Sequence, residues 1–273
     1  MKLLAFELAT EACSVALWID GDVCERFELA PRRHAELALP WAGQLLAQAG
    51  IAKSQLDAIA VGRGPGAFTG VRLAVALAQG IALALDRPIV PVSTLAALAM
   101  QAAAAGFAQD EDAIDGRQGP PHLRTAGSGE PDAGRRVDRA PRPAVKRVLA
   151  SIDARMGEVY AGAFELRDGD TCALSKEMVM APGAVPMIDR AVHWYGVGTG
   201  FAASGGALAQ RLSAQFVTID ATALPHAACI ARLAALAYAR GETIAADLIE
   251  PAYLRNNVAL TMAEQQQLRD SRP

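Results

Sequence analysis

The chain contains 273 residues, of which 52% are hydrophobic, and its formal net charge is −3. This length favours two domains, and the apolar content is ample for a packed core. The acidic balance argues against a dedicated nucleic-acid binder, which is usually basic. A secretory signal is not predicted, because Glu7 interrupts the apolar run that starts at Leu3.

The first part of the chain predicts strands and helices in the order strand, strand, strand, helix, strand, helix, strand, helix, at residues 2–8, 14–19, 23–29, 34–48, 56–61, 70–85, 88–92 and 94–105. Asp20-Gly21 is a strong signal for a two-residue turn between the second and third strands. Pro40 should kink the first helix or delay its start. Three antiparallel strands followed by alternating units imply a mixed sheet with helices on its faces.

The glycine loop and helix at 61–85 organise the rest of the chain. Glycines stand at positions 62, 64, 66 and 70, and Thr69 is the predicted N-cap of the helix. The helix is apolar almost all round, so it must bury more than one face. One face can pack on its own sheet, and the other is expected to meet a second domain or a partner protein. Its apolar stretch is shorter than the roughly 20 residues of a membrane span, and we expect no membrane contact.

Residues 106–144 are dense in Gly, Pro, Asp and Arg and have almost no large apolar side chain. Such a segment cannot bury enough surface to offset its ordering entropy, so we predict a flexible insertion between two domains. The alternative is a tethered basic arm that touches RNA, since the part at 117–147 carries eight basic and three acidic residues.

The remainder predicts a second domain with strands at 147–153, 158–166, 171–180, 194–197 and 215–219, and with helices that end near 212 and 240. Both halves begin with a hairpin-rich sheet and finish with α/β units, which indicates an internal duplication. The expected organisation is therefore a domain at 1–105, the insertion at 106–144 and a second domain at 145–273.

The cysteines, at positions 13, 24, 172 and 229, form no CxxC pair. If Asp20-Gly21 is the turn, Leu17 rather than Cys13 lies opposite Cys24. We expect reduced thiols and a cytoplasmic protein.

Three features bear on binding chemistry. A glycine loop that enters a helix can bind anions, because free N–H groups point at the ligand, and Thr10, Thr69 and Gly70 are candidates for a nucleotide site. A tight strand-to-helix turn is the alternative, since Ala67 breaks the GxGxxG pattern and no Walker lysine follows. The histidines form neither HxxxH nor HExxH, so we predict no metal site and no catalytic residue. A structural ion-pair cluster is expected at one hairpin, from Asp153, Arg155 and Glu158.

Several spaced motifs carry a family resemblance: FELATEACSVAL at 6–17, RGPGAFTGVR at 63–72, VPVST at 90–94, IDARMGEVY at 152–160 and PAYLR at 251–255. Together they resemble the TsaB family of bacterial tRNA threonylcarbamoyladenosine biosynthesis proteins, over the whole chain apart from 106–144. The resemblance implies an α/β protein with the actin-like (ASKHA) fold of two related domains, built from mixed sheets with helices on their faces.

The resemblance also implies a non-catalytic paralogue of TsaD, the ligase that places threonylcarbamoyl on the adenosine next to the anticodon in tRNAs reading codons that begin with A. A TsaB protein works with TsaD and the ATPase TsaE and reaches tRNA through that complex. Two alternatives stay open. One is an ATP-dependent phosphotransferase of the same fold, and the other is a glycoprotease, which would require a metal.

The residues themselves agree with a non-catalytic role. TsaD carries a metal-binding HxxxH motif, and the similar positions here are Thr94 and Leu98, neither of which is a strong metal ligand. The chain also departs from its own family at the end of the first strand, where Glu7-Leu8 replaces the usual Asp-Thr. This departure weakens any nucleotide site in the first domain.

In the family, two helices of the first domain pack on their counterparts in the partner. The resemblance places them here at 34–48 and 70–85, with an expected interface that contains Leu37, Trp41, Arg72, Val75 and Gln79. On this basis Val75→Glu is expected to abolish partner binding and leave a soluble fold. ADP or ATP at that interface, and a homodimer through the same surface when the partner is absent, are further expectations.

Overall fold

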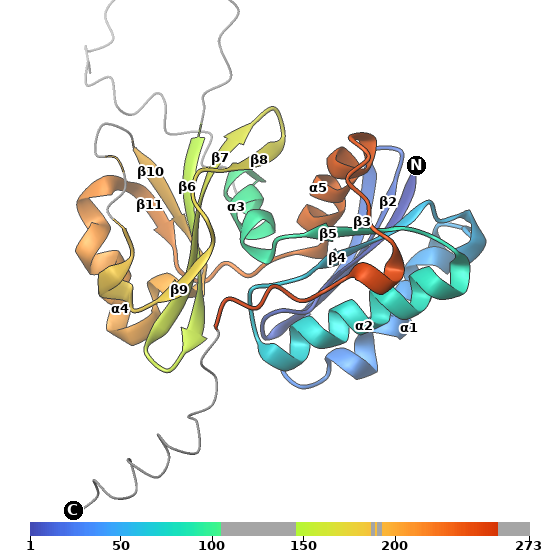
Figure 1. Cartoon of the computed structure of the whole chain (residues 1–273), viewed down its shortest axis with the longest axis horizontal. Helices are drawn as coiled ribbons and strands as arrows, with labels where there is room; N and C mark the ends of the chain where they lie inside the picture. Colours follow the sequence, from blue (N-terminus) through green and yellow to red (C-terminus); the bar gives the residue numbers. More distant parts are fainter. Residues whose placement is uncertain (105–145, 187–188, 190–192, 256–273) are drawn as a thin grey trace, which may run out of the picture.

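The structure is a computed structural model that describes residues 1–104, 146–186, 189 and 193–255. It contains two lobes, each built on one β-sheet (Figure 1). The predictions for the insertion at 106–144 and for the tail beyond 255 lie outside the described residues.

The first sheet has the order β3-β2-β1-β4-β5, with strands β1 (Lys2–Glu7), β2 (Ala12–Ile19), β3 (Asp22–Leu29), β4 (Ala58–Gly62) and β5 (Ile89–Val92). β1, β4 and β5 run parallel, and β2 is antiparallel to both β1 and β3. Asp20 and Gly21 form the turn with positive φ angles of 50° and 117°. The register pairs Leu17 with Cys24, as predicted.

The second sheet has the order β11-β10-β6-β7-β8, with strands β6 (Lys146–Arg155), β7 (Glu158–Arg167), β8 (Asp170–Ala173), β10 (Trp194–Val197) and β11 (Phe216–Asp220). A further strand, β9 (Met178–Met180), pairs with β7, so the predicted strand at 171–180 is in fact two short strands. Starting at β8, the second sheet has the order β8-β7-β6-β10-β11, which corresponds strand for strand to the order β3-β2-β1-β4-β5 of the first sheet. The strand directions correspond as well. The predicted internal duplication is confirmed.

The helices are α1 (His34–Gln48), α2 (Phe68–Leu85), α3 (Thr94–Ala104), α4 (Ala203–Leu212) and α5 (Ala227–Ala239), with short 3₁₀ turns at Lys53–Gln55, Pro182–Ala184, Thr199–Phe201, Ser213–Gln215 and Ala246–Leu248. α1 begins at His34, so Pro40 does not delay its start. α2 begins two residues before the predicted start, and its N-cap is Ala67 rather than Thr69, without a side-chain cap.

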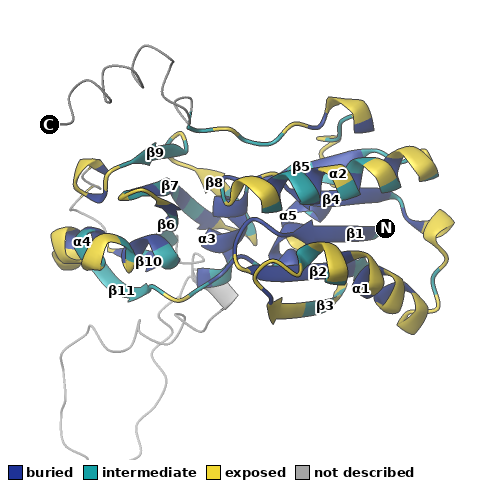
Figure 2. Cartoon of the chain, turned by 90° about the horizontal axis from the view of Figure 1, so that it is seen from below, coloured by how far each residue is buried: buried dark blue, intermediate teal, exposed yellow. Residues whose placement is uncertain are grey.

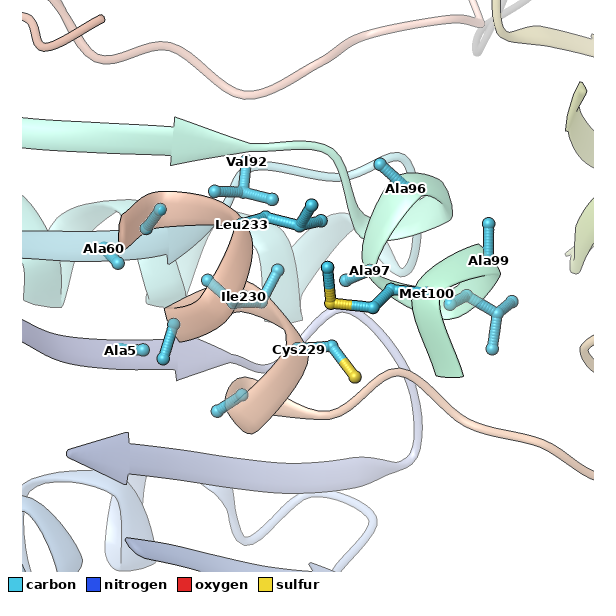
Figure 3. Close-up of a cluster of buried hydrophobic side chains, with 14 of the residues drawn as sticks. Ala5, Ala60, Val92, Ala96, Ala97, Ala99, Met100, Cys229, Ile230 and Leu233 are labelled. Atoms are coloured by element: carbon cyan, nitrogen blue, oxygen red, sulfur yellow. The ribbon is translucent and has the colours of Figure 1, made fainter. Parts of the chain in front are cut away.

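The core consists of three clusters of buried hydrophobic side chains. One lies between the first sheet and α1 and α2, another lies under α4, and the third connects the two lobes. In the third, Ile230 and Leu233 of α5 lie among Ala60 and Val92 of the first sheet and Met100 of α3 (Figure 3). This cluster fixes the two lobes against each other.

Two helices therefore pack across the predicted domain division. α3 follows the first sheet in sequence but packs on β6 and β7, and α5 follows the second sheet but packs on β1 and β2. The chain after α5 continues on the first lobe, where Ile244 and Ile89 exchange backbone hydrogen bonds of 2.9 Å. The boundaries at 105 and 145 separate the strands of the two sheets. The helices that cover the sheets do not follow this division, because α3 covers the second sheet and α5 covers the first.

Among the described residues, α2 is the one helix long and apolar enough to cross a membrane, with a mean hydropathy of 1.7. Length and composition alone are weak evidence for a span, because a core helix of a soluble protein meets the same criterion. Val71, Ala74, Val75, Ala78 and Ala82 of this helix are buried.

Candidate functional site

The first candidate site is the outer face of α1 and α2, the side of these helices that points away from the first sheet (Figure 2). We define it by its exposed apolar and small residues: Leu39, Gly43 and Ala47 on α1, and Phe68, Ala76, Gly80, Leu83 and Ala84 on α2. Leu39, Phe68 and Leu83 expose 48%, 60% and 61% of their surface. No cation or carboxylate of α2 other than Arg72 interrupts it, so the face presents an apolar surface of the kind that marks an interaction site.

None of the predicted interface residues belongs to the exposed set that defines this face. Leu37, Arg72 and Gln79 are partly exposed, and the Gln79 amide donates a 3.0 Å hydrogen bond to the Ala246 carbonyl. Trp41 and Val75 are only 9% and 7% exposed and belong to the core cluster beneath the helices. The side-chain directions expected for these two residues were wrong.

This placement corrects the proposed Val75→Glu test. A carboxylate at Val75 would enter the apolar core beside the sheet, where an unpaired charge is strongly unfavourable. The substitution would therefore disturb folding and could not report on partner binding. Leu83 is the exposed alternative on the same helix.

The second candidate site is a cleft of about 1140 Å³ between the lobes. Its walls are the loop between β1 and β2, the N-terminal end of α2, the hairpin between β6 and β7, and the segment 251–255. The candidate nucleotide residues Thr10, Thr69 and Gly70 all line it, with Thr10 in the loop between β1 and β2 and the other two in the first turn of α2. Arg72 lines it as well, one turn further along α2.

The glycines before α2 allow close packing of two loops. A Cβ on Gly66 or Gly70 would collide with the carbonyl oxygens of Ala9 and Leu8. A 2.7 Å hydrogen bond from the Ala67 N–H to the Ala9 carbonyl oxygen joins the glycine loop to the loop between β1 and β2 at the same place. Packing thus accounts for both glycines, which supports the tight-turn interpretation at these two positions.

Glu7 is enclosed beside the cleft rather than open to it. Thr94 Oγ1 donates a 2.9 Å hydrogen bond to one carboxyl oxygen, and the Ala9 N–H donates a 2.7 Å hydrogen bond to the other. Gly62 leaves the space that this carboxyl fills, since a Cβ there would overlap it. Burial outweighs these hydrogen bonds and raises the pKa of Glu7 from 4.5 to about 7. Thr94 therefore has a structural partner in this chain.

The predicted ion-pair cluster at the second hairpin forms only in part. Arg155 pairs with Asp153 at 2.9 Å, but Glu158 pairs instead with Arg255 at 2.5 Å. Arg255 also donates a hydrogen bond to the Ala154 carbonyl. The motif at 251–255 thus fastens the chain that leaves the first lobe to a hairpin of the second.

His34 contacts the loop between β1 and β2, which forms another wall of the cleft. Its Nε2 lies 3.0 Å from the Thr10 carbonyl oxygen and 3.1 Å from that of Ala12. The residue before it, Arg33, is the N-cap of α1, and no side chain caps this helix. Across the ranges 1–104, 146–186, 189 and 193–255, no three His, Cys, Asp or Glu side chains gather closely enough to hold a metal ion.

The chain is similar to several known proteins. Residues 28–119 match the family model of TsaD, tRNA N6-adenosine threonylcarbamoyltransferase. Over 262 residues the chain is 36% identical to the Escherichia coli tRNA threonylcarbamoyladenosine biosynthesis protein TsaB, which covers 95% of this chain and 96% of the relative. The Haemophilus influenzae TsaB protein is 33% identical over 271 residues, with 94% and 95% covered. The chain belongs to the TsaB family.

Solved structures agree with this assignment of the TsaB family. A crystal structure from Pseudomonas aeruginosa, described as an uncharacterized protein with similarity to peptidase YeaZ, is 39% identical with a TM-score of 0.75. The match covers 93% of this chain and 99% of that one. A second structure, YeaZ from the same organism, gives 38% identity and a TM-score of 0.71. The expected actin-like fold is confirmed.

Several residues that line the cleft of this TsaB family chain were not predicted as site residues from the sequence. Phe68, Tyr253 and Arg255 line the cleft, and Met156 at the tip of the hairpin is 86% exposed. The motif at 251–255 was visible in the sequence, but nothing in it indicated that it would lie against residues of α2. Only the fold brings them together.

Proposed function

We propose that this TsaB family chain is a non-catalytic scaffold and activator subunit for forming threonylcarbamoyladenosine next to the anticodon, in tRNAs that read codons beginning with A. Its partners are a TsaD-type ligase and a TsaE-type ATPase, and tRNA is reached through their complex. The observation that carries the proposal is the outer face of α1 and α2, an open apolar helical surface on a chain of this family.

The outer face has the composition of a docking surface. Leu39, Phe68 and Leu83 provide apolar area, and Ala76 and Gly80 let another backbone come close. Nothing within 4 Å would meet a Cβ at Gly80. Burial of such a surface on association contributes roughly 25 cal/mol per Å² of apolar area, before the costs of association are subtracted.

The cleft supports the non-catalytic part of the proposal. Thr94 and Leu98 stand where TsaD has its ligand histidines, and Leu98 is fully buried in the core. Glu7, a carboxylate near these positions, is already bonded to Thr94 and the Ala9 N–H. The side chains that a metal would need are replaced or engaged in packing.

Co-purification with the TsaD-type partner tests the docking surface. Leu83→Glu places a charge on the outer face without entering the core, and we expect it to lower recovery of the complex at least tenfold. Leu174→Glu is the matched control, because Leu174 is an exposed leucine (45%) that directly follows β8 in the second lobe. Unchanged recovery with Leu83→Glu, in a variant whose circular dichroism matches the parent, would refute docking through this face.

Three smaller proposals accompany this one. The chain acts in the cytoplasm, it forms a homodimer through the outer face when no partner is present, and the docked complex holds ADP or ATP at its interface. Sedimentation of the isolated chain tests the dimer, which should dissociate in Leu83→Glu. An ATP-dependent phosphotransferase, the alternative, would turn over ATP with Mg²⁺ as an isolated chain.

A further inference from the structure

The final stretch of the described chain, residues 249–255, runs from the first lobe to the second, and we call it the crossing segment. It follows the 3₁₀ turn at Ala246–Leu248, which packs on α2, and it ends against the β6–β7 hairpin. In Figure 1 it passes below α3 and α5, the helices at the hydrophobic cluster that the two lobes share. None of these described residues is a member of that cluster. The crossing segment is therefore a separate connection between the lobes.

The first lobe holds the crossing segment over most of its length. Ile249 is buried in the core cluster beneath α1 and α2. The Ala252 N–H donates a 2.8 Å hydrogen bond to the carbonyl oxygen of Arg63, in the loop that follows β4. The ring centroid of Tyr253 lies 5.0 Å from the guanidinium carbon of Arg72 on α2. These contacts place the segment on the first lobe as far as Tyr253.

The second lobe holds the end of the segment through Arg255. Its Nη2 donates to the Glu158 carboxylate at 2.5 Å and to the Ala154 carbonyl oxygen at 3.2 Å. Its Nη1 lies 3.6 Å from the sulfur of Met156. All three partners belong to the β6–β7 hairpin, and the Arg255 side chain is only 18% exposed. A partly buried guanidinium that bonds both a carboxylate and a backbone carbonyl is held more firmly than an isolated surface ion pair.

The two attachments are close together in the sequence. Ala252 is bonded to the first lobe and Arg255 to the second, three residues later. An extended chain spans 3.3–3.6 Å per residue, so the Cα atoms of these two residues cannot be more than about 11 Å apart. While both attachments hold, the hairpin of the second lobe therefore stays near the Arg63 loop of the first.

We propose that the crossing segment is a strap that sets the opening between the lobes, with the contact of Arg255 to Glu158 and Ala154 as its latch. The hydrophobic cluster at α3 and α5 joins the lobes at one place, and lobes joined at one place can rotate about it. The latch closes a second place. Because the β6–β7 hairpin and the start of α2 are both walls of the cleft, the latch fixes the width of the cleft. This device acts in the isolated chain, so it goes beyond partner docking.

A distance across the cleft, measured between two spin labels by double electron–electron resonance, tests the proposal. The labels are placed by Thr69→Cys and Ser204→Cys, at exposed residues on the first-lobe side and beside Ala203 of the second-lobe wall. The exposed native thiols of Cys24 and Cys172 are replaced by serine, and the remaining two cysteines are buried. Labelled full chain is diluted with unlabelled chain, so that only distances within one chain are measured.

Release of the latch should widen the cleft. We expect one narrow distance distribution in the parent, and a longer mean and a roughly twofold broader distribution in Arg255→Gln. Glu158→Gln should give a smaller change in the same direction, because Arg255 keeps its bond to the Ala154 carbonyl oxygen. Arg155→Gln is the matched control, since Arg155 pairs with Asp153 within the same lobe and should leave the distribution unchanged.

Three results would overturn the strap. They are a broad distribution in the parent, an unchanged distribution in a variant that has lost the latch, and an equal change in Arg155→Gln. Circular dichroism checks that each variant is folded, and Glu158→Gln provides the same test if Arg255→Gln does not fold. Partner docking is measured separately through Leu83→Glu, so either idea can fail without the other.

Discussion

At the scale of single residues, Glu7 is the most perturbed group of the cleft region. Its carboxyl is fully buried against Gly62, and its pKa is raised to about 7. The folded protein therefore keeps this proton at pH values where the unfolded chain has lost it. The contribution of Glu7 to the free energy of unfolding falls as the pH rises from 4.5 to about 7, by up to roughly 3 kcal/mol.

Glu7→Gln removes this titration. Urea unfolding at pH 5 and pH 8 should give a smaller loss of stability on going to pH 8 for Glu7→Gln than for the parent chain. The absolute stability of the variant is a separate matter, because an amide offers one acceptor oxygen to the two donors, Thr94 Oγ1 and the Ala9 N–H. An identical pH difference in both proteins would show that Glu7 does not titrate in this range.

The cysteines provide a second test at this scale. Cys13 and Cys229 are buried, and burial raises the pKa of each thiol to about 11, whereas Cys24 and Cys172 are exposed. Because the thiolate is the reactive form, a disulfide reagent such as DTNB should label Cys24 and Cys172 in the folded protein. Cys13 and Cys229 should react only after denaturation. Rapid native labelling of either would contradict the burial described here.

At the scale of elements, α2 combines two glycines with opposite roles. Gly70 faces the Leu8 carbonyl, so Gly70→Ala should cost more than about 2 kcal/mol of stability through a backbone collision. Gly80 lies on the open face with nothing near its Cβ position, so Gly80→Ala should add up to about 1 kcal/mol by raising helix propensity. Thermal unfolding of both variants measures the difference. Equal effects would mean that the first turn of α2 does not pack on the β1–β2 loop.

Elements were the part of the fold best predicted from sequence. The bounds of α1 and of β10 match the predictions, and the turn at Asp20-Gly21 sets the predicted register, because turn chemistry and hydrophobic periodicity are local signals. The direction of side chains on α2 could not be found this way. A helix that is apolar all round has no polar face to distinguish its core side, so Val75 was placed outward although it lies inward.

Contacts between distant segments were also beyond the sequence. Glu7 meets Thr94 across 87 positions, and Arg255 meets Glu158 across 97, and no local pattern signals either pair. Arg72 was predicted as a partner contact, but its place between Phe68 and Tyr253 depends on how the final segment crosses the cleft. Individual residues of the cleft could thus be selected from the sequence, but the sequence did not indicate which of them lie together.

At the scale of the whole molecule, α3 and α5 tie the two lobes together. The start of α5 is fastened to the first sheet, since the N–H groups of Ala227 and Ala228 donate to Ser14 Oγ and to the Glu25 carboxylate at 2.8 and 3.0 Å. A fragment of residues 1–105 lacks this helix and would expose the sheet face that α5 covers. The two halves of the sequence are therefore not expected to be independent folding units.

Expression of the halves tests this interlock. Residues 1–105 alone should be insoluble, and co-expression with residues 145–273 should restore a soluble complex of both pieces. The full chain serves as the reference in circular dichroism. A well-folded, monomeric 1–105 fragment would contradict the role of α5 as part of the first lobe.

The central claim is that this chain supports threonylcarbamoyladenosine formation by docking and performs no chemistry itself. The most direct measurement is the amount of this nucleoside in tRNA from cells that lack their own TsaB, complemented with this chain or its variants. The account predicts restored modification by the parent chain and by Leu174→Glu, and none by a folded Leu83→Glu. Equal modification with Leu83→Glu, or no modification with the parent chain, would contradict it.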